Sequence, residues 1–273
     1  MSDAALRRTV DRLRAAPKYR QVHIDTIVDI VRREAAHATN DADLERRARL
    51  KLHKVIADYL LRGRQSRLLR GLDQAVADGS DALRAWCRGT LGRHFSTAER
   101  LPDLDHLYPA ILDLTGPADS IADLACALNP FTVPWLRQAS AATYTGYDLN
   151  QSYVDLGTGF LSAIDSVATV EHRDVLVRPS DIRADVALLL KTYHCMEDRR
   201  AGAALRLVSE LATPNVVVSF PIRTMSGRVS PFTRAHIERL TELADERAWE
   251  LRRTTLAEEE LVVLVKKDTG GPD

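Results

Sequence analysis

The run Trp249-Glu-Leu-Arg-Arg-Thr-Thr-Leu256 lies near the end of the 273-residue chain, and Glu260-Leu-Val-Val-Leu-Val-Lys-Lys267 follows it after only Ala257-Glu-Glu259. Both runs are rich in the β-branched and aliphatic residues that favour strands. Three residues are too few for the helical crossover that parallel neighbours require. The two runs therefore predict an antiparallel hairpin.

Upstream of this hairpin, short apolar runs alternate with helical stretches. The predicted strands are Ser120–Cys126, Ala142–Leu149, Ala168–Val175, Ala184–Lys191 and Asn215–Pro221, and helices are expected near residues 131–138, 151–163, 197–212 and 232–246. This alternation is typical of a parallel sheet covered by helices on both faces. Five parallel strands closed by an antiparallel hairpin indicate the doubly wound, Rossmann-like α/β fold of S-adenosylmethionine (SAM) methyltransferases. We expect that domain at residues 108–268, with a disordered tail at 269–273.

Residues 1–107 have a helical apolar period instead, which predicts an all-helical N-terminal domain. The formal net charge is zero, but residues 1–110 hold 21 of the 38 Lys and Arg and only 15 of the 38 Asp and Glu. Residues 46–70 contain nine basic residues and a single acidic one, Asp58. Such a block indicates a phosphate-binding surface, with a solvated helix face as the alternative.

Three predicted strands end in groups that suit a nucleoside ligand, which binds outside the carboxyl ends of an open parallel sheet. The first runs into Asp123-Leu-Ala-Cys-Ala-Leu-Asn129-Pro130, where small residues let the backbone approach a ligand and Asp123 can accept from an amine. Asp148 ends the second strand, where a ribose is usually held. Asp174 ends the third and can accept from an adenine amino group. Without a Gly-x-Gly-x-x-Gly motif, NAD is not expected.

Five segments of the chain form a recognisable set. They are His94-Phe-Ser-Thr-Ala-Glu-Arg100, Asp123–Pro130, Tyr147-Asp148-Leu149, Leu188-Leu-Leu-Lys191 with Cys195-Met-Glu197, and Val216-Val-Val-Ser-Phe-Pro221. From about Lys18 to Lys267 the chain resembles the aminoglycoside-resistance 16S ribosomal RNA (guanine-N7) methyltransferases. The resemblance implies SAM as cofactor and methylation of a decoding-site guanine in the assembled small (30S) ribosomal subunit. It also implies resistance to drugs of the kanamycin and gentamicin type.

The resemblance further implies roles for single residues. Arg100 would hold the SAM carboxylate, Asp123, Ala125, Ala127 and Asn129 its methionine end, Asp148 and Leu149 the ribose, and Asp174 and Val175 the adenine. Lys191 and Glu197 would border the target base as catalytic residues, with Lys191 also at the cofactor. RNA contacts are expected from Lys18, Arg20, Arg46, Arg47, Arg49, Lys51, Lys54, Arg62, Arg64, Arg67, Arg70, Arg223 and Arg228. The chain departs from the family at Ala127, where glycine is usual, and after Gly227-Arg228, where Lys-Gly often follows.

Guanine N7 has a free lone pair and no proton, so its methylation needs alignment and exclusion of water rather than a general base. N7 lies in the deep groove of an RNA helix, and the base must therefore be flipped out or unpaired, with Tyr193, His194 or Phe220 as stacking candidates. Carbon methylation by Cys195 is not expected, because its neighbour His194 would face the other side of a strand.

Several classes of protein are not expected from this sequence. No apolar run approaches the roughly 18–20 residues of a membrane span, and charges throughout the first 20 residues argue against a secretory signal. Three widely spaced cysteines and scattered histidines predict neither a disulfide framework nor a metal site. We expect a cytoplasmic monomer. Two alternatives stay open: a small-molecule methyltransferase of antibiotic biosynthesis, and a ribosome-binding homologue that has lost catalysis.

Overall fold

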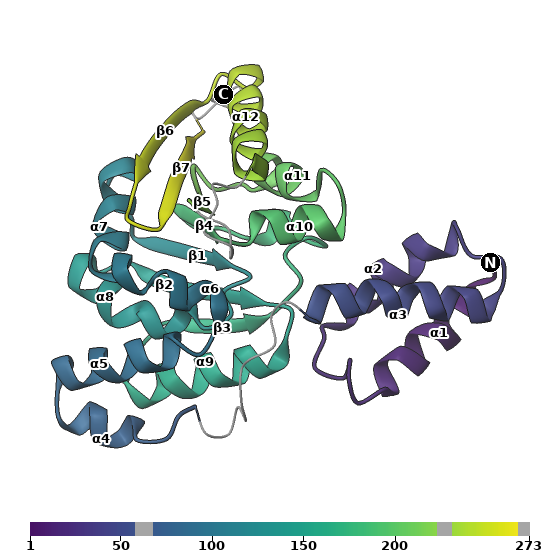
Figure 1. Ribbon diagram of the computed structural model, residues 1–273, viewed down its shortest axis with the longest axis horizontal. Coiled ribbons are helices and arrows are strands. Elements are labelled where there is room, and N and C mark those ends of the chain that lie inside the picture. Colours follow the sequence, from purple (N-terminus) through teal and green to yellow (C-terminus); the bar gives the residue numbers. More distant parts are fainter. Residues whose placement is uncertain (58–67, 223–230, 267–273) are drawn as a thin grey trace, which may run out of the picture.

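The computed structural model describes residues 1–57, 68–222 and 231–266. They form a seven-stranded sheet with helices on both faces and a separate group of three helices (Figure 1). The strands are β1 (Ser120–Leu124), β2 (Thr143–Asp148), β3 (Thr169–His172), β4 (Val186–Leu190), β5 (Asn215–Pro221), β6 (Glu250–Thr255) and β7 (Glu259–Val265). The helices are α1 (Asp3–Ala15), α2 (Ile24–Ala35), α3 (Asp41–Ala57), α4 (Leu72–Ala77), α5 (Ser80–Leu91), α6 (Phe95–Glu99), α7 (Leu104–Thr115), α8 (Val133–Ala139), α9 (Gln151–Ala163), α10 (Tyr193–Arg199), α11 (Ala203–Glu210) and α12 (Pro231–Glu246).

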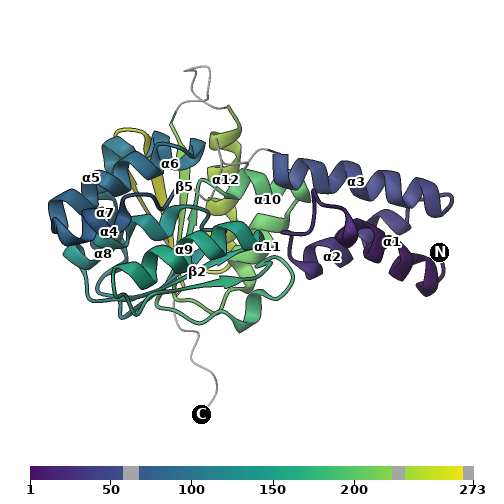
Figure 2. The ribbon, with the colours of Figure 1, turned by 90° about the horizontal axis from the view of Figure 1, so that it is seen from below.

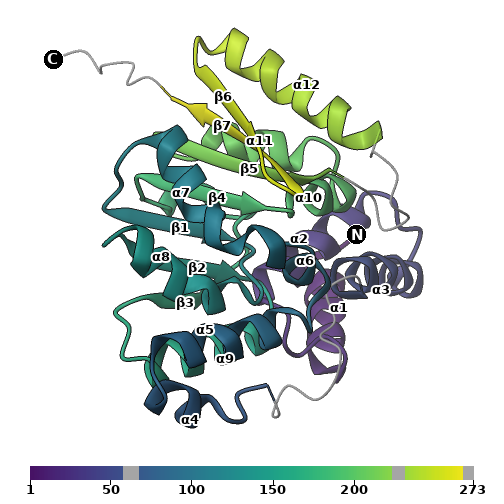
Figure 3. The same ribbon diagram turned by 60° about the vertical axis from the view of Figure 1, so that its left-hand side comes forward.

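The sheet has the strand order β3-β2-β1-β4-β5-β7-β6, which Figure 3 shows from bottom to top. The first five of these strands are parallel. β7 runs antiparallel to both β5 and β6. The doubly wound sheet with a C-terminal antiparallel hairpin, predicted from the sequence, is confirmed. The strand order reverses between β1 and β4, so a ligand is expected at their carboxyl ends.

Alternate residues of the central strands face two different cores. On β4, Val186, Leu188 and Leu190 pack with α7, α8 and α9, whereas Ala187 and Leu189 pack with α10, α11 and α12. Figure 2 shows α7 and α8 on one side of β5 and α10 and α12 on the other. Burial on both faces explains why these strands are almost continuously apolar.

A third core lies within α1, α2 and α3 and includes Leu13, Ile27 and Leu52. These helices lie beyond the carboxyl ends of the parallel strands (Figures 1 and 3). In contrast, Leu72 of α4 and Leu91 of α5 share the core that contains the sheet. The packing therefore divides the chain after α3 rather than near residue 107. Helical periodicity shows that a face is apolar, but it does not show which partner covers that face.

Most predicted elements differ from the structure by at most two residues at an end, and two differ more. The helix expected near residues 197–212 is divided into α10 and α11 by Gly202, whose φ of 76° lies in the left-handed region that glycine favours. The third strand stops at His172, because Asp174 begins a turn in which its carbonyl accepts from the Val177 N–H at 3.1 Å. In the part of the chain that the structure describes, no helix combines the length and apolar character needed to cross a membrane.

Candidate functional site

A cluster of buried polar side chains lies at the carboxyl ends of β1 and β4. Asp123 belongs to β1, Asn129 to the turn after it, and Lys191 follows β4, while Arg100 follows α6 and Glu259 begins β7. All five residues are at most 4% exposed. Buried charges are costly unless they are paired, and hydrogen bonds and ion pairs connect these five groups.

Arg100 is the centre of this cluster. Its Nε donates to Glu259 Oε1 at 2.6 Å, its Nη2 donates to Oε2 at 3.3 Å, and its Nη1 donates to Asn129 Oδ1 at 2.9 Å. A guanidinium has five N–H donors in a planar fork that matches a carboxylate. Among the contacts of the described residues, one N–H on each Nη is left for a ligand. Burial raises the pKa of Glu259, but the Arg100 and Lys191 cations outweigh this effect and hold that pKa below its usual value.

Asp123 is hydrogen-bonded to Asn129, which in turn contacts Arg100. Its Oδ2 accepts from Tyr144 Oη at 2.7 Å and, through a short bond, from the side-chain amide of Asn129. Burial raises the pKa of Asp123, while these two hydrogen bonds oppose the rise. Asp123 therefore fixes the orientation of Asn129 and, through it, of Arg100.

The turn after β1 has two alanines in the left-handed region, Ala125 with φ 60° and Ala127 with φ 44°. That conformation costs a non-glycine residue about 1–2 kcal/mol. The turn is held against β2, because Cys126 N–H donates to the Tyr147 carbonyl at 3.0 Å. A Cβ on Gly146 would lie 2.8 Å from Cys126 Sγ, so this close approach requires glycine. Ala127 thus has a backbone conformation that glycine adopts more readily than alanine.

Asp148, at the end of β2, is oriented by two main-chain amides. Ala127 N–H donates to its Oδ2 at 2.9 Å and Asn150 N–H to its Oδ1 at 2.8 Å. Burial raises the pKa of Asp148 to about 6, although these two bonds lower it. Each carboxylate oxygen can accept more than one hydrogen bond, so both can also receive a ligand hydroxyl.

Asp174 lies after β3 and meets the three-helix domain. Its Oδ2 accepts from Thr26 Oγ1 at 2.6 Å and lies 2.7 Å from Arg199 Nη2, while its Oδ1 accepts from Leu176 N–H at 3.0 Å. Burial raises the pKa of Asp174, but the Arg199 cation and the hydrogen bonds bring it below its usual value. The neighbouring Val175 is buried. Leu149, after β2, packs against the core of the three helices.

Lys191 has a left-handed backbone with φ 58°, and its N–H donates to Ser219 Oγ at 3.0 Å. Its Nζ lies 3.0 Å from Glu99 Oε2 and 3.5 Å from Glu259 Oε1. The ammonium is therefore held between two carboxylates, one of which also pairs with Arg100.

Glu197, which we expect to border the target base, is hydrogen-bonded to main-chain amides. Its Oε2 accepts from Gly202 N–H at 2.8 Å, and its Oε1 accepts from Ala204 N–H at 2.9 Å. These amides lie at the start of α11, where the main chain lacks intrahelical partners. Both carboxylate oxygens are thus engaged by a helix terminus.

Two of the three stacking candidates are buried. Tyr193 and Phe220 contact each other edge to face, with ring centroids 5.5 Å apart, whereas His194 is exposed. The expectation that His194 and Cys195 face opposite sides of a strand is wrong, because both lie on α10. His194 Nε2 is 3.2 Å from Cys195 Sγ.

The candidate RNA-contact residues are described only in part, since Arg62, Arg64, Arg67, Arg223 and Arg228 lie outside the described residues. Arg46 and Arg47 pair with Asp43, and Arg49 pairs with Glu45, all within α3. These ion pairs reduce the net positive charge of the helix. The predicted basic block is therefore partly neutralised.

A smaller group of basic side chains on the three-helix domain is exposed. Lys51 and Lys54 lie on α3, and Lys18 and Arg20 lie on the loop between α1 and α2. Lys18 Nζ is 2.6 Å from His53 Nδ1, which joins this loop to α3. We call these four side chains the α3 basic surface. Arg70, which precedes α4, is also exposed but belongs to the sheet domain.

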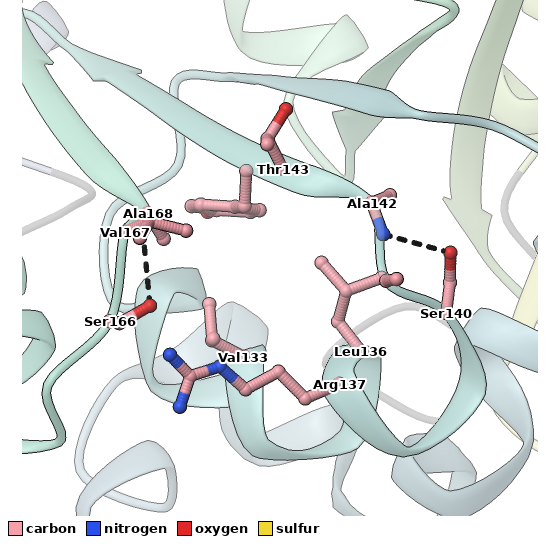
Figure 4. Close-up of a pocket in the computed structure, with 11 residues that line it drawn as sticks. Val133, Leu136, Arg137, Ser140, Ala142, Thr143, Ser166, Val167 and Ala168 are labelled. Atoms are coloured by element: carbon pink, nitrogen blue, oxygen red, sulfur yellow. Dashed lines mark hydrogen bonds between the residues drawn. The ribbon is translucent and has the colours of Figure 1, made fainter.

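A pocket of about 230 Å³ lies at the opposite end of the strands (Figure 4). It is lined by Val133 and Leu136 of α8 and by residues at the amino ends of β2 and β3, including Thr143 and Ala168. Ligands of such sheets bind at the carboxyl ends, so this pocket is separate from the candidate site. Among the described residues, no three His, Cys, Asp or Glu side chains are grouped to hold a metal ion.

Comparison with known proteins agrees with this geometry. The family model described as "Ribosomal RNA methyltransferase (FmrO)" matches residues 14–264. The chain belongs to this family. The FmrO match begins within α1 and ends within β7, so it includes the three-helix domain and both strands of the hairpin.

Curated relatives cover nearly the whole chain. A 16S rRNA (guanine(1405)-N(7))-methyltransferase of Micromonospora rosea is 30% identical over 257 residues, which are 91% of this chain and 92% of the relative. A protein of the same description from Frankia casuarinae is 31% identical over 272 residues, or 96% and 93% of the two chains.

Solved structures of 16S rRNA methyltransferases have the same fold. The 16S rRNA methyltransferase RmtF in complex with S-adenosyl-L-homocysteine (SAH) matches with a TM-score of 0.78 and 25% identity, covering 98% of this chain and all of the other. The 16S rRNA methylase RmtB matches with a TM-score of 0.75 and 28% identity, covering 96% and 98%. The chain is thus a SAM-dependent ribosomal RNA methyltransferase.

The structure adds residues that the sequence did not single out. Glu99 and Glu259 pair with Lys191, and Thr26 and Arg199 bind Asp174. Glu259 lies in the acidic turn of the hairpin, which is the one local signal that was available. Its contact with Arg100 depends on the β5–β7 register, which the sequence does not reveal.

Proposed function

We propose that this chain methylates N7 of a guanine in the decoding-site helix of 16S rRNA, with the assembled 30S subunit as substrate. One observation carries the proposal: the Arg100 fork and the Asp148 carboxylate, in a chain of the FmrO family, lie at the strand ends where the sheet reverses its order. Together these two groups offer a site for an amino-acid carboxylate and one for a ribose.

The residues at this edge fit SAM. The two remaining N–H groups of Arg100 suit its carboxylate, and the left-handed turn through Ala125 and Ala127, next to Asn129, suits its methionine end. Asp148 and the main chain at Leu149 would hold the ribose. Asp174 and Val175 would hold the adenine. When bound, SAM supplies an electrophilic methyl group on a sulfonium.

The residues on the target side position the base rather than move protons. Guanine N7 attacks with its own lone pair, so alignment supplies much of the rate. We propose that Lys191, held by Glu99 and Glu259, borders the target base and the cofactor, and that exposed His194 stacks on the base. Glu197 is proposed to support this region by capping α11.

The α3 basic surface is proposed to bind ribosomal RNA phosphates. Four exposed cations on one small domain attract phosphate without sequence preference, and each engaged contact makes the affinity more dependent on salt. We further propose that the protein acts as a cytoplasmic monomer and confers resistance to kanamycin- and gentamicin-type drugs. Membership of an RNA methyltransferase family favours this function over a small-molecule methyltransferase.

The test is transfer of labelled methyl from SAM to purified 30S subunits, with naked 16S RNA in parallel. Labelling of subunits well above naked RNA is the expected result. Labelling of naked RNA alone would contradict the assembled subunit as substrate. Binding of SAH without any transfer would favour the homologue that has lost catalysis.

A further inference from the structure

The three-helix domain contacts the sheet domain at the loop assigned to the SAM ribose. His23 N–H donates to the Leu149 carbonyl at 2.7 Å, and Gln151 N–H donates to the Gln21 carbonyl at 2.8 Å. Val22 and Asn150 form an antiparallel β-bridge between these bonds. The segment that enters α2 is therefore hydrogen-bonded to the loop that follows Asp148.

A second contact joins α2 to the group assigned to the adenine. Thr26 Oγ1 donates to Asp174 Oδ2 at 2.6 Å. Arg199 of α10 lies with its Nη2 2.7 Å from Asp174 Oδ2 and 3.2 Å from Asp29 Oδ2. Thr26 and Asp29 are one turn apart on α2, so this helix binds Asp174 both directly and through Arg199.

This contact joins three charged groups and one hydroxyl, and it is buried except at Asp29, whose side chain is 25% exposed. The Arg199 side chain is 8% exposed and that of Asp174 is 1% exposed. A displacement of α2 would take the Thr26 hydroxyl from Asp174 and the Asp29 carboxylate from Arg199. Asp174 and Arg199 would keep each other, but each would lose a hydrogen-bond partner, which is costly for a buried group. The position of α2 and the orientation of Asp174 are therefore set together.

We infer that Arg199, with Thr26 and Asp29, couples docking of the three-helix domain on RNA to binding of the SAM adenine. The inference rests on the proposed function. RNA bound at the α3 basic surface fixes the three helices, and α2 then holds Asp174 in the orientation that accepts from adenine. Arg199 is a positioning residue, since it acts through Asp174. Because linkage is reciprocal, SAM also tightens the binding of the 30S subunit by the same factor.

The experiment measures SAH affinity of the full chain with and without saturating 30S subunits, by equilibrium dialysis of labelled SAH, which carries no methyl to transfer. For the native sequence we expect SAH to bind on the order of fivefold or more tightly with subunits present. The reciprocal measurement, subunit affinity with and without saturating SAH, should give the same factor. If Arg199, Thr26 and Asp29 served only the stability of the fold, 30S subunits would not change the SAH affinity through them.

Two variants and a control locate the coupling. Arg199→Lys keeps the charge, but the lysine side chain is shorter and its ammonium does not reach the position from which Arg199 Nη2 contacts both Asp174 and Asp29. Thr26→Val removes only the hydroxyl. In both, the coupling factor should fall to about one while thermal unfolding stays cooperative. The matched control is Arg178→Gln, because Arg178 pairs with Asp25 of α2 at 2.8 Å in the same junction but is 61% exposed. The control should keep the factor of the native sequence.

The outcomes separate this inference from the function on which it rests. If the native chain methylates subunits but SAH affinity is the same with and without them, the coupling is overturned and the function stands. A coupling factor that survives in both Arg199→Lys and Thr26→Val overturns the role of these residues. If one variant fails to fold, the other still decides. A native chain that binds SAH but methylates no subunit overturns both proposals.

Discussion

Arg100 and Glu259 form a buried ion pair although 159 positions separate them in the sequence. The pair joins the segment after α6 to the first residue of β7, the second strand of the C-terminal hairpin. Because Glu259 also contacts Lys191, one carboxylate orients the group proposed for the SAM carboxylate and the group proposed for the target base. The hairpin is thus part of the site as well as of the sheet.

Removal of this carboxylate should be costly. Glu259→Ala leaves two buried cations without their shared partner, and breaking a buried pair in this way lowers the free energy of unfolding by about 3–5 kcal/mol. SAH affinity should also fall, because Arg100 loses the partner that orients its fork. Denaturant unfolding and SAH titration measure the two effects.

The control for that variant lies on the same hairpin. Glu260 pairs with Arg253, which is 48% exposed, and exposed pairs contribute about 0–1 kcal/mol. Glu260→Ala should therefore change the free energy of unfolding by less than about 1 kcal/mol. Equal losses in the two variants would contradict a special role for Glu259.

Cofactor binding should depend on pH through Asp148. Its pKa in the free protein is raised to about 6 by burial, and only the carboxylate can accept from both ribose hydroxyls. SAH affinity should be constant above about pH 7 and fall roughly tenfold per pH unit below 6. For this group alone, the free energy of unfolding of the ligand-free protein falls as pH rises from about 4 to about 6, because the native state binds the extra proton.

Asp148→Asn provides the control for the pH profile. It should bind SAH weakly at every pH and lose the dependence near pH 6. A profile with the same midpoint in Asp148→Asn would assign the titration to another group.

The left-handed conformation of Ala127 in the turn after β1 leads to a prediction about the stability of its variants. Ala127→Gly removes backbone strain of about 1–2 kcal/mol but adds freedom to the unfolded chain, which offsets about 0.4–1 kcal/mol. The variant should be as stable as the native sequence or slightly more stable, with SAH affinity preserved. Ala127→Val should lose both stability and SAH affinity, because a β-branched residue is a strong outlier at positive φ. Thermal unfolding with and without SAH compares the three proteins, and equal damage by glycine and valine would refute the assigned conformation.

Substitution of Glu197 tests whether its carboxylate caps α11 or acts on the target base. Glu197→Ala should lower the free energy of unfolding by about 1–2 kcal/mol, as loss of a cap does. Methyl transfer at a temperature where the variant is folded should fall only a few-fold. Unchanged stability together with a loss of more than a hundredfold in kcat would show that Glu197 acts on the base directly.

The α3 basic surface should separate RNA binding from cofactor binding. Lys51→Glu with Lys54→Glu reverses two exposed charges and should greatly weaken binding to 30S subunits, with SAH affinity unchanged. The control is Arg183→Glu with Arg206→Glu, which makes the same change in charge on exposed residues of the sheet domain. Equal loss of subunit binding in both pairs would mean that net charge, rather than this surface, determines docking.

Much of the fold could be predicted from local patterns. β5 and α9 have their predicted bounds, since an apolar run and a helical period identify such elements without reference to their neighbours. The grouping of helices into domains was not predictable in this way, because the apolar face of α5 gives no sign that it meets the sheet. The same holds for the site. Asp148 could be predicted as a site residue because it ends a strand. Glu259 and Arg199 could not, because they reach the site through contacts between distant segments.

The most direct test is identification of the modified nucleoside in 16S rRNA from subunits that were incubated with SAM and this protein. Nuclease digestion with mass spectrometry identifies the methylated base, and strand scission at 7-methylguanosine locates it in the RNA. We expect one added 7-methylguanosine, in the decoding-site helix, which is absent when Asp148→Asn replaces the native sequence. A methyl group on another atom or outside that helix, or no added methyl at all, would contradict the proposed function.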